Sequence, residues 1–239
     1  MLLVLAAAVL VVAVLMVRGL LVLVSIEPRA AYWREQADLP GDVVYVALGD
    51  SLSQGIGSSS PEESFVAALA DDLAVTTGEQ VRVVNLSVTG ATTEELVDSQ
   101  LPAFTDLLAE LADEGVPVGL VTLCIGSNDV GDVPAEQYRQ QLGVVLDALP
   151  AGSYVTDVPD FNGGPDLDGA AELARVAREE VTARDDLVLV PLEDYTAELS
   201  VTEYAGDFFH PSDSGYDRYV AAFRSVMTER SDTTARGER

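Results

Sequence analysis

The chain has 239 residues, and its 40 acidic side chains outnumber 13 arginines, with no lysine, to give a formal net charge of −27. This charge excludes a nucleic-acid partner, because phosphate backbones need a basic surface. Without lysine there can be no Walker-type phosphate loop and no lysine Schiff base. One cysteine, Cys124, excludes an internal disulfide, and its apolar neighbours predict a buried structural thiol. With a single histidine, the chain also lacks the ligands of a Cys/His zinc site.

Residues 1–26 are apolar apart from a few positions, of which Arg18 is the only charged one. We expect an uncleaved membrane anchor, because the stretch reaches the length of a membrane span if Arg18 is tolerated. A secretory signal peptide is the alternative, although no basic n-region or clear cleavage site is present. We expect the following domain to lie outside the cytoplasm, as is usual after such leaders, whether anchored or secreted. The flanking Arg29 and Arg34 taken alone would favour the cytoplasmic side.

The rest of the chain reads as one domain between two polar segments. Residues 27–41 are polar and bounded by prolines, which predicts a linker. Residues 42–228 carry the apolar patterning of a single folded domain. Residues 229–239 are charged and lack apolar periodicity, so we expect a disordered tail.

Short apolar runs alternate with helical patterns through the domain. The runs are continuous, as expected of strands buried on both faces, and therefore predict a parallel sheet covered by helices on both sides. Ser60-Pro61-Glu62-Glu63 and Thr92–Glu95 have the spacing of helix starts. Two helical faces follow from apolar spacing later in the chain. The strand runs are Val43–Leu48, Val81–Leu86, Gly119–Ile125, Tyr154–Val158 and Leu187–Leu192, and the faces are Tyr138/Leu142/Val145/Leu146/Leu149 and Tyr216/Tyr219/Val220/Phe223/Met227.

A serine follows the first strand, in Gly49-Asp50-Ser51-Leu52-Ser53-Gln54-Gly55. Ligands of parallel sheets bind at the carboxyl ends of the strands, so Ser51 is placed as a nucleophile would be. An ordinary glycine-serine turn is the alternative. A phosphate-binding loop of the flavodoxin kind is another, because residues 55–60 are rich in donors.

The single histidine lies in Asp207-Phe-Phe-His210, just before the last predicted helix. A histidine can accept a serine proton if a partner at its other ring nitrogen fixes the tautomer. Asp207 and Asp213 are both three residues from His210, so spacing does not choose between them.

Gly90 and Asn128 follow the second and third predicted strands, which places them on the same rim as Ser51. Acyl transfer requires donors directed at the developing oxyanion. The backbone N–H groups of Gly90 and Ser51 and the side-chain amide of Asn128 are candidates. Seen alone, each is more simply a turn residue.

Together these four blocks resemble the SGNH (GDSL) hydrolase family. Gly49-Asp50-Ser51-Leu52-Ser53 is similar to its first block, Gly90 to its second, Gly126-Ser-Asn128-Asp129 to its third and Asp207-Phe-Phe-His210 to its last. The resemblance spans roughly residues 43–227. It implies a flavodoxin-like, three-layer α/β/α fold, Asp207 as the partner of His210, and neither a metal nor a cofactor.

The resemblance also implies a serine esterase or lipase-type hydrolase, with Ser51, His210 and Asp207 as catalytic residues and Ser51, Gly90 and Asn128 as the oxyanion hole. The expected substrate is a small-molecule, lipid or glycan acyl ester, and we expect a monomer. An acyltransferase with the same site and an alcohol or sugar acceptor is one alternative. Others are an inactive binding module of the same fold and a flavin-binding protein.

Overall fold

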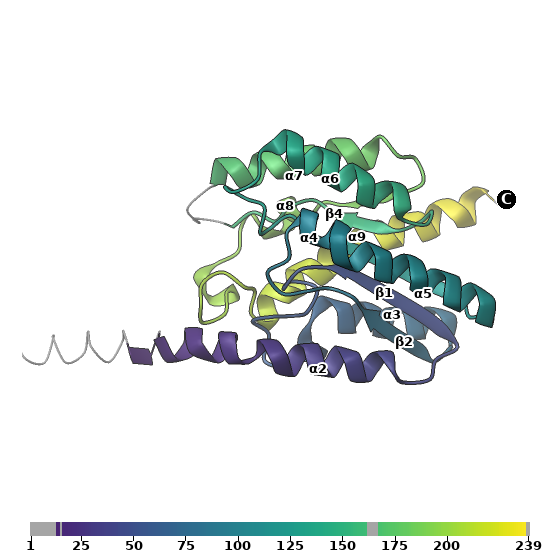
Figure 1. Cartoon of the computed structure of the whole chain (residues 1–239), viewed down its shortest axis with the longest axis horizontal. Coiled ribbons are helices and arrows are strands. Elements are labelled where there is room, and N and C mark those ends of the chain that lie inside the picture. Colours follow the sequence, from purple (N-terminus) through teal and green to yellow (C-terminus); the bar gives the residue numbers. More distant parts are fainter. Residues whose placement is uncertain (1–12, 15, 162–166, 238–239) are drawn as a thin grey trace, which may run out of the picture.

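The computed structural model describes residues 13–14, 16–161 and 167–237. Five parallel strands form one sheet in the order β2-β1-β3-β4-β5 (Figure 1). This is the flavodoxin-like order, in which the strand order reverses between β1 and β3: the chain passes from β1 to β2 on one side and to β3, β4 and β5 on the other. Such a switch point leaves a crevice at the carboxyl ends of β1 and β3. The predicted three-layer α/β/α fold is therefore confirmed.

All five predicted strands are present, and the last two are shorter than expected. They are β1 (Val43–Gly49), β2 (Val81–Asn85), β3 (Val118–Cys124), β4 (Tyr154–Thr156) and β5 (Val188–Val190). Pro191 directly follows β5, and proline disfavours continuation of a strand. Helix α8 (Leu192–Thr196) takes up the end of the expected fifth run.

Both faces of the sheet are covered, which is why the strands are continuously apolar. Strand β1 is buried at every position, and its side chains alternate between two hydrophobic clusters. Val44, Val46 and Leu48 pack with α5 (Leu101–Glu114), α6 (Ala135–Ala148) and α7 (Leu167–Thr182). Tyr45 and Ala47 pack on the other face, with α3 (Phe65–Thr77) and α9 (Asp213–Gly237). Cys124 is buried and free, as predicted.

Two predicted helix starts have different outcomes. Thr92 and Glu95 form the expected capping box at α4 (Thr93–Glu95). The Ser60 side chain caps nothing; residues Pro61–Glu63 form one 3₁₀ turn, and Ser64 caps α3 by accepting the Ala67 N–H at 3.2 Å. Both serines have the extended backbone that is usual for an N-cap, but only Ser64 directly precedes an α-helix.

The expected linker at 27–41 is instead mostly helical. Helix α2 (Ile26–Ala37) lies along the domain beside the β2 edge (Figure 1). Trp33 is 3% exposed and its indole N–H donates to the Gln54 carbonyl at 3.1 Å. The polar residues that suggested a linker form the solvent face of this helix.

The expected anchor, residues 1–26, lies partly outside the described residues. Within the described part of the chain, no helix combines the length and apolar character needed to cross a bilayer. At the other end, α9 continues to Gly237 through most of the expected disordered tail.

Candidate active site

The four motif blocks converge at the carboxyl ends of the three central strands. Ser51 follows β1, Gly90 follows β2, Asn128 follows β3, and His210 lies on the loop before α9. In the strand order, β1 is flanked by β2 and β3, so the three turns are neighbours. Gly49 permits their close approach: its φ is +141°, and a Cβ there would lie 2.0 Å from the Cys124 carbonyl oxygen.

Ser51, His210 and Asp207 form a continuous hydrogen-bonded chain. The Ser51 Oγ lies 2.9 Å from His210 Nε2, and His210 Nδ1 lies 2.6 Å from Asp207 Oδ2. Because Asp207 contacts Nδ1, the neutral imidazole carries its proton there and leaves Nε2 free to accept the serine proton. Asp213, the other carboxylate at the same spacing, instead accepts the Ser59 backbone N–H at 2.6 Å.

A tight turn holds His210 over Ser51. The Asp207 carboxylate accepts the backbone N–H groups of Phe209 and His210, both at 3.1 Å, as aspartate does in Asx-type turns. Ala205 donates to the His210 carbonyl at 2.7 Å and closes the turn. Phe208 has a φ of +58°, a left-handed conformation that is uncommon for a bulky residue. Asp207 therefore both builds the turn and contacts the imidazole.

Opposing effects set the ionisation of Asp207. Partial burial raises its pKa, but the hydrogen bond and charge of His210, with the two backbone N–H groups, outweigh burial and leave the pKa below its ordinary value. The Asp207 carboxylate is thus ionised at neutral pH and can stabilise a protonated imidazole.

Of the three expected oxyanion donors, two have no hydrogen-bond acceptor among the described residues and one is already hydrogen-bonded. In the described part of the chain, the N–H groups of Ser51 and Gly90 donate to no protein acceptor. The Asn128 amide donates to the Ala91 carbonyl at 3.0 Å and faces Asp50 Oδ2 at 3.4 Å. Gly90 has a φ of +85°, which explains the glycine at this turn.

Two buried carboxyl groups tie the turns together beneath these donors. Burial raises the pKa of Asp50 to about 7, although the Leu52 N–H donates to it and lowers that value. Burial also raises the pKa of Asp129, which accepts the backbone N–H of Thr93 at 3.0 Å and its hydroxyl at 3.1 Å. Asp129 thus fastens the Asn128 turn to the start of α4.

Two glutamines that sequence reasoning missed also hold the site. The Gln54 amide donates to the Ser87 carbonyl at 2.7 Å and accepts the Thr89 hydroxyl at 2.8 Å, which joins the Ser51 and Gly90 turns. Gln100 accepts the Gly49 N–H at 3.0 Å and donates to the Gly49 carbonyl at 2.7 Å. Gln54 lies within the first motif and could have been suspected. Gln100 carries no local signal, because only the fold brings it to Gly49.

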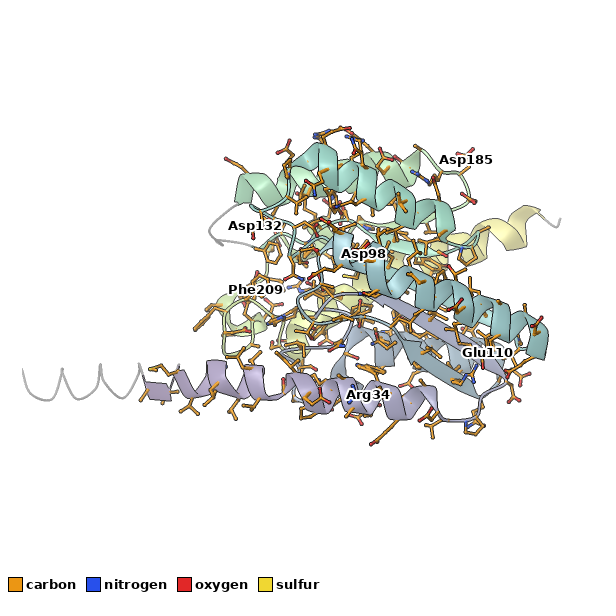
Figure 2. All side chains as sticks on the ribbon, viewed as in Figure 1. Arg34, Asp98, Glu110, Asp132, Asp185 and Phe209 are labelled. Carbon is orange, nitrogen blue, oxygen red and sulfur yellow. The ribbon has the colours of Figure 1, made fainter. Side chains whose placement is uncertain are left out.

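Aromatic side chains and a small cavity border the site. Phe209 packs edge-on against the His210 ring at 4.9 Å and stacks on Phe161 at 5.3 Å. Figure 2 shows Phe209 on the left of the view, the side on which the strands end. A cavity of about 310 Å³ lies beside Gly90 and is lined by Val88 and by two acidic residues, Glu95 and Asp98, among others. These acidic and apolar lining residues favour binding of an uncharged, partly apolar group over binding of an anion.

Comparison with known proteins agrees with this geometry. Residues 47–218 match the model of the GDSL-like lipase/acylhydrolase family. The chain is 27% identical over 221 residues to the GDSL-like esterase Rv1075c of Mycobacterium tuberculosis, covering 84% of this chain and 67% of that protein.

Solved structures give the same fold. An acetylxylan esterase, Axe2 from Geobacillus stearothermophilus, superposes with a TM-score of 0.58 at 21% identity, over 75% of this chain and 91% of Axe2. TesA superposes with a TM-score of 0.59 at 24% identity, over 77% of this chain and 97% of TesA. Since the family model spans most of the chain, the protein belongs to the GDSL-like lipase/acylhydrolase family and is a carboxylic ester hydrolase.

Proposed function

We propose that the protein cleaves an acyl ester through a covalent intermediate on Ser51. The observation that carries this proposal is the hydrogen-bonded chain from Ser51 Oγ through His210 to Asp207, at 2.9 and 2.6 Å. A serine hydroxyl is a weak nucleophile unless a base removes its proton during attack. His210 is positioned for that proton transfer.

In the first half-reaction, Ser51 Oγ bonds to the ester carbonyl carbon while its proton passes to His210 Nε2. The imidazolium is stabilised by the ionised Asp207. His210 then gives the proton to the leaving alkoxide as the carbon–oxygen bond breaks, and the alcohol departs. In the second half-reaction, water attacks the acyl-Ser51 ester with His210 again as base, and the acid and free Ser51 are released.

The tetrahedral intermediates carry a negative oxygen, for which we propose the Ser51 and Gly90 N–H groups and the Asn128 amide as donors. Support comes from the two backbone N–H groups, which have no protein acceptor among the described residues. The Asn128 amide has two N–H donors, and we propose that it exchanges its longer contact, with Asp50 Oδ2 at 3.4 Å, for the oxyanion. Such donors act where charge develops and so favour the transition state.

We infer an uncharged acyl ester as substrate. Glu95 and Asp98 beside Gly90, together with the net charge of −27, disfavour a polyanion near the reacting carbonyl. Phe209 and Phe161 offer an apolar wall next to His210. An acyl chain can pack on these rings, so we expect esters longer than acetate to be preferred.

Residues 1–26 would hold this enzyme at a membrane, with the catalytic domain outside the cytoplasm. Support comes from the exposed apolar side chains of residues 16–24, namely Met16, Val17, Leu20, Leu21, Leu23 and Val24. The intact mass of the protein recovered from membranes shows whether residues 1–26 are retained. Protease protection in sealed vesicles shows on which side of the membrane the catalytic domain lies. The monomeric state stays a prediction, to be measured by sedimentation in detergent.

The central experiment combines turnover with trapping of the acyl group. The parent should hydrolyse 4-nitrophenyl butyrate and react with a fluorophosphonate, whose phosphonyl group should map to the Ser51 peptide by mass spectrometry. Ser51→Ala should lose both reactions, whereas Ser53→Ala, at a neighbouring buried serine, should still be labelled at Ser51. Unchanged turnover in Ser51→Ala would refute the proposal.

A further inference from the structure

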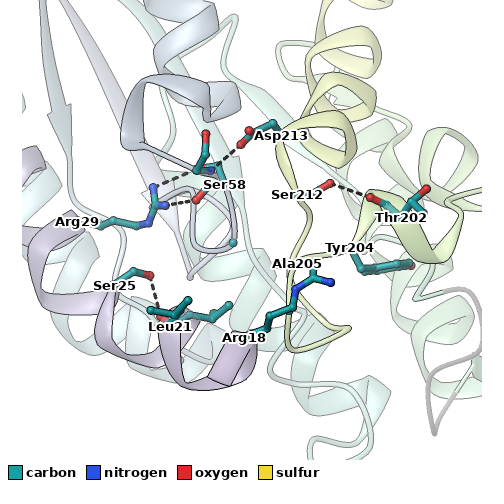
Figure 3. A pocket seen from close by; sticks show the side chains of 14 residues that line it. Arg18, Leu21, Ser25, Arg29, Ser58, Thr202, Tyr204, Ala205, Ser212 and Asp213 are labelled. Carbon is teal, nitrogen blue, oxygen red and sulfur yellow. Dashed lines mark hydrogen bonds between the residues drawn. The ribbon is translucent and has the colours of Figure 1, made fainter. Parts of the chain in front are cut away.

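A second cavity lies beside the active-site loops and belongs to neither the catalytic residues nor the oxyanion donors. It measures about 410 Å³ and lies between the N-terminal helix (residues 16–37, with a turn at Ser25), the turn at 57–59 and the loop at 202–213 (Figure 3). Arg18 and Arg29 line it from the helix, and Asp213 lines the opposite side. Ser51 and His210 are not part of its wall, so the cavity is separate from the catalytic pair.

Arg29 is a buried cation that meets only neutral groups. Its side chain is 4% exposed, and one terminal nitrogen donates to the Ser58 hydroxyl at 3.0 Å while the other donates to the Ser58 carbonyl. In the described part of the chain, its Nε has no acceptor and no carboxylate lies within ion-pair distance. A buried charge is ordinarily paired, because desolvation is costly without an opposite charge. The charges of Asp213 and Glu62 act on Arg29 only from beyond ion-pair distance, so no carboxylate contacts the guanidinium among the described residues.

The lack of an acidic partner is unusual in so acidic a protein. Most described arginines pair with carboxylates, and those left without one are Arg18, Arg29 and Arg82. Two of these line the same cavity. Its one acidic lining residue, Asp213, has an oxygen engaged by the Ser59 N–H. Two guanidinium groups thus face a single carboxylate, and the balance of charge in the cavity is positive.

The positions of the two arginines define the ligand. They are eleven residues apart, about three helical turns, and both line the cavity. Arg29 is enclosed and Arg18 is exposed. Guanidinium groups bind phosphate oxygens in planar, bidentate geometry. The volume exceeds what one phosphate ion requires and leaves room for an attached polar group.

We propose that this cavity binds a phosphate group, held by Arg29 and closed over by Arg18. Two sources share this chemistry: the headgroup of an anionic phospholipid and free inorganic phosphate. The first is consistent with the exposed apolar residues that continue along the same helix, including Leu20, Leu23 and Val24. Binding here does not depend on ester hydrolysis, so the test uses no turnover.

The test measures binding by the full chain in a neutral detergent, by calorimetry and thermal unfolding. Inorganic phosphate should bind and raise the melting temperature, whereas chloride at equal ionic strength should not. Arg29→Gln and Arg18→Gln should each weaken binding about tenfold or more, as expected for loss of charged hydrogen bonds. Arg34→Gln is the matched control, because Arg34 lies on the same helix but pairs with Glu27 at 2.6 Å outside the cavity.

The outcomes separate the sources and can overturn the proposal. Tighter binding of dihexanoyl phosphatidylglycerol than of inorganic phosphate, with dihexanoyl phosphatidylcholine weaker than both, would identify a lipid headgroup. Equal binding of phosphatidylglycerol and phosphate would identify free phosphate. If Arg29→Gln does not fold, phosphate binding by Arg18→Gln still tests the site, because Arg18 is exposed and its replacement should not prevent folding. No phosphate binding by the parent, or equal binding in Arg18→Gln and Arg34→Gln, would refute the site.

Discussion

His210 Nε2 lies 2.9 Å from Ser51 Oγ although the two residues are 159 positions apart in the chain. The contact depends on both turns, since Gly57 passes so close to the histidine loop that a Cβ there would lie 2.7 Å from the His210 Cβ. A glycine is therefore needed where the Ser51 turn meets the His210 turn. This packing, rather than any local motif, sets the serine–histidine distance.

Asp207→Asn should lower kcat for 4-nitrophenyl butyrate by about 10²–10⁴-fold with little change in fold. The amide cannot stabilise the imidazolium, and its NH₂ group can turn toward Nδ1 and favour the wrong tautomer. Asp213→Asn is the informative comparison, because Asp213 has the same spacing from His210 but contacts Ser59. A loss in Asp213→Asn as large as that in Asp207→Asn would show that the wrong carboxylate has been assigned.

Asn128→Ala should lower kcat by about 10²–10³-fold and change KM little, because the amide acts on charge that appears only in the transition state. Removing the amide also deletes its contact with the Ala91 carbonyl, so unfolding by urea should accompany the kinetics. A rise in KM with kcat unchanged would show that Asn128 already binds the substrate in its ground state.

The stability of the protein should fall as pH rises from about 4 to about 7. Asp50 has a folded-state pKa of about 7, well above its unfolded value of about 4, so the folded state binds more protons in this interval. The contribution is up to about 4 kcal/mol and is constant above pH 7. Asp157, with a pKa raised by burial to about 6, adds a slope of the same sign.

Urea unfolding at pH 5 and pH 8 measures this effect. Asp50→Asn should reduce the difference in unfolding free energy between the two pH values, and Asp113→Asn, an exposed carboxylate on α5, should leave it unchanged. An Asp50→Asn protein with the parent's full pH dependence would show that Asp50 is ionised in the fold. The variant should also lose activity, since an amide at position 50 brings an NH₂ group against that of Asn128.

The sheet and the four motif blocks could be predicted because each has a local signal. Buried parallel strands are continuously apolar, and Ser51, Gly90 and Asn128 directly follow such strands. Gln100 could not be found in this way, because its contacts with Gly49 bridge 51 positions of sequence. The choice of Asp207 over Asp213 likewise follows from the turn that places one carboxylate on the ring and directs the other to Ser59.

The sequence of α2 predicts a linker because its composition is polar and its apolar stripe is narrow. Its two buried side chains are Arg29 and Trp33, and a periodicity argument gives two such positions little weight. The Trp33 N–H donates to Gln54, the residue that joins the Ser51 and Gly90 turns. A segment whose composition predicts a linker therefore contacts the residue that joins two active-site turns.

Trp33→Ala should accordingly destabilise the fold by about 3–5 kcal/mol, the usual cost of removing a buried aromatic side chain. Trp33→Phe keeps most of the packing and loses the bond to the Gln54 carbonyl, so it should cost less, about 1–3 kcal/mol. Urea unfolding measures both, and turnover of 4-nitrophenyl butyrate well below the melting temperature shows whether the Gln54 contact also positions the site. Arg34→Ala on the exposed side of α2 should change neither quantity appreciably, since exposed ion pairs contribute little. If Trp33→Ala were as stable as Arg34→Ala, α2 would not be packed on the domain, and residues 27–41 would be the linker that their composition predicts.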